Sequence, residues 1–99
     1  MDIKRDFEDS NRKVTIKVQG RFVFGLHKEF RNAYRDLDGA TKEYEVDLSQ
    51  AVYLDSAALG MLLLLQEHAN TFSAKVSIVG ATPDVRRILD IGRIQLRSA

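Results

Sequence analysis

The chain has 99 residues, of which 44% are hydrophobic and 29% charged, and it contains one proline and no cysteine. This length and composition predict a single globular domain over residues 1–99 and exclude disulfide and thiolate chemistry. The formal net charge of +1, from 15 basic and 14 acidic residues, gives no electrostatic reason to expect nucleic acid or an anionic membrane as a partner.

No segment carries the pattern of an exported or membrane-spanning protein. The first six residues lack the apolar core of a signal peptide. The longest apolar run, Ala57–Leu65, is about half of the roughly 20 residues that a spanning helix needs. We therefore expect a cytoplasmic protein with no direct membrane insertion.

The first third of the chain predicts a hairpin followed by a helix. Residues 3–7 and 14–18 alternate apolar and polar side chains around a turn cluster at residues 9–12, which indicates two antiparallel strands. The short segment of residues 21–25, apolar apart from Arg21, either extends the sheet or leads into the next helix. Apolar side chains then recur at helical spacing over residues 26–37.

The middle of the chain predicts a strand and a long apolar helix. Residues 43–48 alternate as a strand, and a polar break at Ser49–Gln50 follows. The helix over residues 56–72 is apolar nearly all round until Gln66, whereas a helix buried on one face shows a polar stripe. Its first half is therefore flanked by two neighbouring helices or partly exposed for a partner, and both can hold.

The last third predicts a strand, a capped helix and a final strand. Residues 75–79 form the strand, Thr82 is a natural N-cap, and Pro83 suits the first helical position. The helix ends at Gly92, and residues 94–96 form a short last strand. The order β-β-α-β-α-β-α-β predicts an α/β domain with a mixed sheet of about five strands and helices packed mainly on one face.

The candidate site lies where the long apolar helix begins, at Asp55–Ser56. The first turn of a helix has unpaired backbone N–H groups and a partial positive charge, and both stabilise an anion. The same two residues also fit an ordinary N-cap, in which Asp55 or Ser56 accepts a backbone hydrogen bond. The pattern alone thus indicates either a simple cap or a modifiable hydroxyl at a helix end that favours anions.

The run Asp55-Ser56-Ala57-Ala58-Leu59-Gly60, after the strand Val46-Asp47-Leu48, resembles the phosphorylation motif of the STAS family of anti-sigma factor antagonists. Two further segments, Val18–Gly20 and Gly80–Gly92, resemble other parts of the family pattern. The resemblance implies the STAS fold over residues 1–99. It also implies that Ser56, directly after the Asp, is the residue that a partner kinase phosphorylates. We expect the partner-binding residues to be Asp55, Ser56, Ala57, Ala58, Leu59 and Met61.

Two departures from the family pattern are visible. Many antagonists carry an acidic residue shortly after the glycine of the second strand, but here Arg21–Phe24 follows Gly20. Ala57–Ala58 replaces the more usual Ser/Thr-Gly after the serine, which leaves Ser56 as the only hydroxyl of the motif.

From this resemblance we expect a regulatory binding protein, not an enzyme, with no cofactor and no metal. It binds an anti-sigma factor or regulatory kinase when Ser56 is unphosphorylated and is released on phosphorylation. The expected partners are a serine kinase/anti-sigma factor and a serine phosphatase, as two proteins or one bifunctional protein. One alternative is a STAS docking subunit of a membrane lipid-transport ATPase complex, which needs no phosphorylation. The other is a nucleotide-binding sensor.

The remaining polar residues fit no catalytic or metal-binding pattern. His27 and His68 each lack a second ligand at metal-binding spacing. Asp47 and Asp55 are more simply a strand residue and a cap residue than a catalytic carboxylate pair. Three arginines form a solvated face that can still contribute to a partner surface: Arg86, Arg87 and Arg93.

Overall fold

The computed structural model describes residues 2–92 and the backbone of residues 97–98, which form one mixed sheet and its helices. The strand order is β1-β2-β3-β4-β5, with β1 antiparallel to β2 and all other neighbours parallel. The predicted α/β class, mixed sheet and element order are confirmed. The strands are β1 (Ile3–Glu8), β2 (Lys13–Phe22), β3 (Glu43–Leu54), β4 (Lys75–Val79) and β5 (Arg97–Ser98); the helices are the 3-10 helix η1 (Phe24–Leu26), α1 (His27–Asn32), α2 (Ser56–Thr71) and α3 (Pro83–Ile91).

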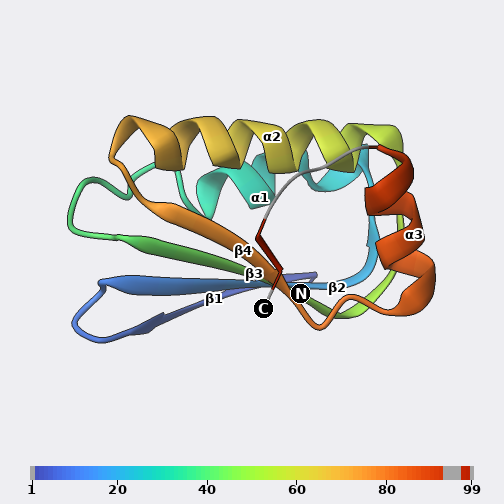
Figure 1. Ribbon diagram of the computed structural model, residues 1–99, viewed down its shortest axis with the longest axis horizontal. Coiled ribbons are helices and arrows are strands. Elements are labelled where there is room, and N and C mark those ends of the chain that lie inside the picture. The colour runs from blue at the N-terminus through green and yellow to red at the C-terminus, as the bar shows by residue number, and fades with distance from the viewer. Residues whose placement is uncertain (1, 93–96, 99) are drawn as a thin grey trace.

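The helices α1 and α2 cover one face of the sheet, and α3 lies beside the end of the sheet where α2 begins (Figure 1). The hydrophobic core lies between these helices and the sheet, because successive strand residues point to opposite faces of the sheet and the apolar ones point to the helix side. In the parallel ladder Val14 is opposite Tyr44 and Ile16 is opposite Val46, and all four are fully buried. The other face carries the alternate, polar residues of the same strands: Lys13, Thr15, Lys17, Glu43, Glu45 and Asp47.

The strand β3 is longer than the sequence pattern indicates, and the expected polar break at Ser49–Gln50 is wrong. Both residues are exposed, but the strand continues through them to Leu54. It does so because β2 runs on to Phe22 and pairs with it, with Gly20 opposite Ala51 and Phe22 opposite Leu54. The open question about residues 21–25 is resolved by the same pairing, since residues 21–22 extend the sheet and η1 follows.

The first α-helix is shorter than the predicted range of residues 26–37. After α1 the backbone closes into turns, in which Ala33 N donates to both Glu29 O and Phe30 O, at 3.1 Å each. Leu37 N then donates to Tyr34 O at 2.9 Å. The predicted apolar face nevertheless packs, because Phe30, Ala33 and Tyr34 are buried. The strand predicted over residues 94–96 lies outside the described residues, and β5 follows it.

The apolar first half of α2 is both flanked by neighbouring helices and partly exposed, so the two alternatives drawn from the sequence hold together. Its inner stripe is buried against the sheet and comprises Ala58, Met61, Leu62, Leu65 and Ala69. Its neighbours are α1 on one side and the end of α3 on the other, where the Leu59 side chain occupies the space that a Cβ at Gly92 would need. Leu63 and Leu64 are nonetheless 50% and 56% exposed. None of the helices in the described ranges is long and apolar enough to cross a membrane.

Candidate functional site

Asp55 is the N-cap of α2 and ties the helix to the segment after β2. Its backbone is extended, and its Oδ1 accepts a hydrogen bond from Ala58 N at 2.8 Å. Its Oδ2 accepts a second hydrogen bond, from Phe24 N at 3.1 Å, and its own N–H donates to Phe22 O at 3.2 Å. One carboxylate therefore completes the first turn of α2 and fixes the position of η1 beside it.

Ser56 is the first residue of α2 and is exposed. Because Asp55 performs the capping, the Ser56 hydroxyl has no hydrogen-bond partner among the described residues. The first turn of α2 after the cap contains no acidic side chain. An accessible hydroxyl thus lies at the end of the helix dipole that stabilises negative charge.

Exposed apolar residues lie near Ser56. Gly60 and Leu63 follow Ser56 at i+4 and i+7, so the three share one outward stripe of α2, and all are exposed. The backbone of Phe24 is held beside the helix start by its hydrogen bond to Asp55, and its side chain, whose ring stacks on His27, is 61% exposed. We call these four residues the Ser56 face. Exposed apolar groups of this kind commonly mark surfaces that bind other proteins.

The structure brings four of the six predicted partner-binding residues to the surface. Ser56 is exposed, and Asp55, Ala57 and Leu59 are partly exposed. Ala58 and Met61 face the core, at 0% and 6% exposure, because they belong to the stripe that α2 buries. In this fold the two side chains are therefore buried rather than exposed beside Ser56.

Sequence reasoning missed three members of the Ser56 face. Gly60 and Leu63 could have been found from helical spacing alone, by counting four and seven residues from Ser56. No local signal marks Phe24, because its position depends on a hydrogen bond to a residue 31 positions away.

Asp47 has a structural role at the point where β4 stops pairing with β3. Its Oδ1 accepts a hydrogen bond from Ser49 N at 2.9 Å. Partial burial alone would raise the pKa of Asp47, but hydrogen bonds from Ser49 and the charge of Lys17 outweigh it and lower this pKa. Gly80 packs against the same group with a φ of +73°, and a Cβ there would lie 2.8 Å from Ser49 Cβ.

The two histidines are held by backbone carbonyls. His27 Nδ1 lies 2.9 Å from Phe24 O, and His68 Nε2 lies 2.8 Å from Leu37 O. In residues 2–92, no three His, Cys, Asp or Glu side chains gather closely enough to hold a metal ion. Arg86 and Arg87 are exposed on α3, while the predicted Arg93 lies outside the described residues.

Comparison with known sequences identifies relatives over most of the chain. A family model described as "Mlab, STAS domain" matches residues 6–95. A STAS-domain containing protein of Pseudomonas aeruginosa (strain UCBPP-PA14) is 48% identical over 84 residues, which cover 85% of this chain and 83% of that protein.

Comparison with solved structures finds the same fold at low sequence identity. The anti-sigma factor antagonist SpoIIAA in its unphosphorylated form matches with a TM-score of 0.75 and 13% identity, covering 98% of this chain and 86% of that one. The Bacillus SpoIIAA in its phosphorylated form matches with a TM-score of 0.69 and 13% identity, covering 98% and 90%. A sulfate transporter family protein from Wolinella succinogenes matches with a TM-score of 0.73 and 13% identity, covering 85% and 73%.

The fold shared with SpoIIAA is consistent with the family that the sequence comparisons identify. Since the family model spans most of the chain and the Pseudomonas relative is identical at nearly half of the aligned positions, this chain belongs to the STAS domain family.

Proposed function

We propose that this STAS domain is a regulatory binding protein of the anti-sigma factor antagonist type, and that phosphorylation of Ser56 controls its contact with a partner. The observation that carries the proposal is the exposed Ser56 hydroxyl. Asp55 caps the helix, so the Ser56 hydroxyl is not used for capping, and exposed apolar residues lie near it. The fold shared with SpoIIAA, known in unphosphorylated and phosphorylated forms, supports it.

The proposed switch works through charge at the Ser56 face. A phosphate on Ser56 adds about −1.5 to −2 charges next to Asp55, whose carboxylate is already bound to Ala58 N and Phe24 N. The helix end tolerates this charge, because a dipole contributes roughly 0.3–1 kcal/mol in its favour. The fold therefore persists after phosphorylation.

Phosphorylation has a larger effect on the binding free energy of a partner that covers the Ser56 face than on the stability of the fold. Burying an unpaired dianion against Leu63 and Phe24 costs several kcal/mol, and about 1.4 kcal/mol changes affinity tenfold. Unphosphorylated protein thus binds and phosphorylated protein is released. The proposed partners are a serine kinase/anti-sigma factor and a serine phosphatase, as one bifunctional protein or two, and the protein acts in the cytoplasm as a binding protein without catalysis.

A second candidate function is a docking subunit of a membrane lipid-transport ATPase complex. The match to the family model described as "Mlab, STAS domain" and the fold shared with a sulfate transporter family protein favour it. In this role the Ser56 face is a permanent contact, and the serine hydroxyl is not a switch.

The test combines phosphosite mapping with binding. Intact-mass analysis of the protein from its own cells is expected to find a phosphate at Ser56 that is lost in Ser56→Ala. The Ser56→Ala protein, used as bait with cross-linking, is expected to capture a kinase or anti-sigma factor that Ser56→Asp does not capture. Ser10→Asp combined with Ser56→Ala adds the same charge at an exposed serine of the hairpin turn, and this double variant should capture the partner as Ser56→Ala does.

Two results would overturn the proposal. The first is an unmodified Ser56 in every growth condition. The second is equal capture of an ATPase subunit by the Ser56→Ala and Ser56→Asp proteins, which would establish the docking role instead.

A further inference from the structure

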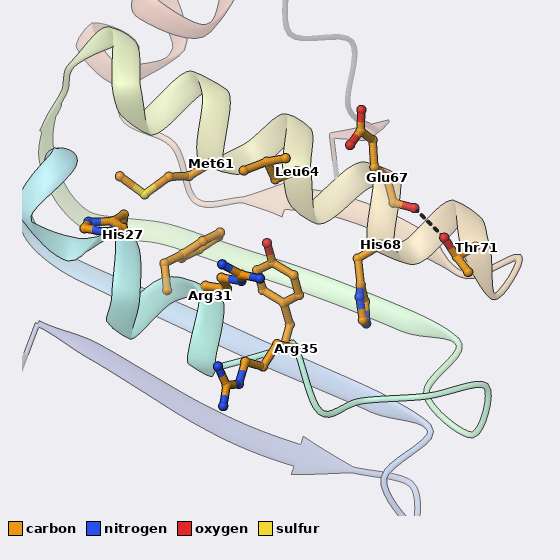
Figure 2. Close-up of a pocket in the computed structure, with 10 residues that line it drawn as sticks. His27, Arg31, Arg35, Met61, Leu64, Glu67, His68 and Thr71 are labelled. Atoms are coloured by element: carbon orange, nitrogen blue, oxygen red, sulfur yellow. Dashed lines mark hydrogen bonds between the residues drawn. The ribbon is translucent and has the colours of Figure 1, made fainter.

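A pocket of about 560 Å³ lies between α1 and α2 (Figure 2). Most of the α2 side chains that line it, among them Met61, Leu64 and His68, are turned away from Ser56 by up to roughly a third of a circle, whereas Glu67 lies on the same stripe as Ser56. The pocket therefore lies beside the Ser56 face and borders it where the Phe24 ring stacks on the ring of His27, a lining residue, with centroids 4.5 Å apart. Its volume falls within the roughly 300–1,000 Å³ that is typical of small-molecule sites.

The floor of the pocket is apolar and aromatic. Phe30 and Tyr34 from the first helical segment and Met61 from α2 line it and are almost fully buried. Leu64 also lines it but is more than half exposed, so a ligand in the pocket would cover apolar surface that the fold leaves in water. The pocket thus favours a ligand with a compact apolar body.

The rim of the pocket is basic. Arg31 and Arg35 line it on the α1 side, and neither forms an ion pair or side-chain hydrogen bond among the residues that the structure describes. Glu67 is the one acidic residue in the lining, and Figure 2 shows its carboxylate directed away from the two arginines. Two guanidinium groups with unused donors favour a carboxylate, sulfonate or phosphate.

The aromatic wall offers a further donor and is held in place. The Tyr34 hydroxyl is protonated at neutral pH, because its ordinary pKa of 10.0 is far above neutral and burial raises it further, and it can donate to an anion. The His68 ring lies edge-on to Tyr34 with centroids 5.1 Å apart, and its bond to Leu37 O fixes its orientation. The wall is therefore formed before any ligand arrives.

We infer that this pocket binds a small amphipathic organic anion. The apolar body of the ligand lies on the floor formed by Phe30, Tyr34 and Met61, and its acidic group pairs with Arg31 and Arg35. The inference is independent of phosphorylation at Ser56.

The test compares two fluorescent probes that share a ring system and differ in charge. The probes are 1-anilinonaphthalene-8-sulfonate, which is an anion, and N-phenyl-1-naphthylamine, which is uncharged. Titration of the folded, full-length chain is expected to show tighter binding of the sulfonate. The double variant Arg31→Gln/Arg35→Gln is expected to weaken the sulfonate about tenfold, equivalent to about 1.4 kcal/mol, and to leave the amine within about twofold.

Two further variants separate the pocket from general effects. Arg12→Gln/Arg87→Gln removes two exposed arginines elsewhere, so it lowers the formal net charge from +1 to −1 as the pocket variant does, and it should leave both probes unchanged. Leu64→Gln changes a half-exposed lining residue and should weaken both probes, with an unchanged circular dichroism spectrum as the check on folding.

Three results would overturn the inference. Equal affinity of the wild-type protein for the two probes would show that the anionic group does not contribute to binding. Equal loss of sulfonate affinity in the two arginine double variants would show that the net charge of the protein, rather than Arg31 and Arg35, determines sulfonate binding. Unchanged probe binding in Leu64→Gln would place the probes outside the pocket.

Discussion

At the scale of single residues, Asp55 has the largest structural role in the candidate site. Its two carboxylate oxygens have different partners, since Oδ1 completes the first turn of α2 and Oδ2 holds Phe24 N. Ser56 next to it forms no such bond. Asp55 therefore holds the site together, whereas the Ser56 hydroxyl is left accessible for modification.

Asp55→Ala is expected to lower the free energy of unfolding by about 1–2 kcal/mol or somewhat more, because the cap and the bond to Phe24 N are both lost. Asp55→Asn keeps one side-chain oxygen and should lose less. Ser56→Ala, the matched control, should stay within about 0.5 kcal/mol of the wild type. Urea unfolding of the four proteins measures these differences, and an equal loss in Asp55→Ala and Ser56→Ala would contradict the assignment of the cap.

Asp47 gives the fold a pH dependence. Its pKa in the folded state is below the ordinary value of 3.8, because the Ser49 hydrogen bonds and Lys17 outweigh the effect of burial. The carboxylate therefore stabilises the fold above pH 3.8, and this stabilisation is lost as the pH falls through the lower folded-state pKa. The difference in unfolding free energy between wild type and Asp47→Asn should be largest at neutral pH and shrink in acid. A difference that stays constant from pH 7 to about pH 2 would contradict this.

At the scale of elements, the sequence predicts what local chemistry determines. Alternation predicted the hairpin, and the cap of α3 was predicted from Thr82 and Pro83; in the structure Thr82 Oγ1 accepts from Val85 N at 3.3 Å. The motif located the start of α2 at Ser56. These features depend on neighbours within a few residues, so a single sequence carries enough information.

Other features depend on contacts between distant residues and were missed. Ser49 and Gln50 are polar and would end an isolated strand, yet pairing with the far end of β2 keeps them in β3. The place of Phe24 in the Ser56 face depends on Asp55, far along the chain. The pocket between α1 and α2 depends on how two helices pack, which periodicity does not specify.

The glycine in the first half of α2, Gly60, offers a prediction about stability. A Cβ at Gly60 meets nothing within 4 Å, and the residue is exposed within the helix. Gly60→Ala should therefore raise the free energy of unfolding by about 0.5–1 kcal/mol. Gly80→Ala, where φ is +73° and Ser49 Cβ is 2.8 Å away, should lower it. Thermal and urea unfolding of both variants provide the measurement, and a loss of stability in Gly60→Ala would contradict the open geometry of that position.

At the scale of the whole molecule, the fold presents surfaces of different character. The helix side carries the Ser56 face, which begins at the start of α2, and the pocket between α1 and α2, which Figure 2 shows. The opposite side is an uncovered sheet face on which charges alternate across strands, with Lys13 opposite Glu43 and Glu43 opposite Lys75. Lys13 also forms an ion pair with Glu45 at 3.2 Å. Such mutually compensated charges favour a solvated surface.

The adjacent residues Leu63 and Leu64 test whether the two helix-side surfaces are separate. Both are about half exposed, but Leu63 lies on the Ser56 face and Leu64 lines the pocket. Leu63→Gln should reduce capture of the partner by the Ser56→Ala protein and leave probe binding unchanged, and Leu64→Gln should do the reverse. Capture by cross-linking and titration with 1-anilinonaphthalene-8-sulfonate measure the two properties. Loss of both in either variant would show that the surfaces are not independent.

The pairing of β2 with β3 has a consequence for how the chain folds during synthesis. This ladder is the core of the sheet, yet it joins residues about 30 positions apart, from Lys13 with Glu43 to Phe22 with Leu54. A β1–β2 hairpin alone is at best marginally stable in water, so it cannot hold Val14, Ile16 and Val18 out of solvent. The nascent chain therefore stays unfolded until the residues up to Leu54 have left the ribosome, and it exposes those apolar side chains to chaperones until then.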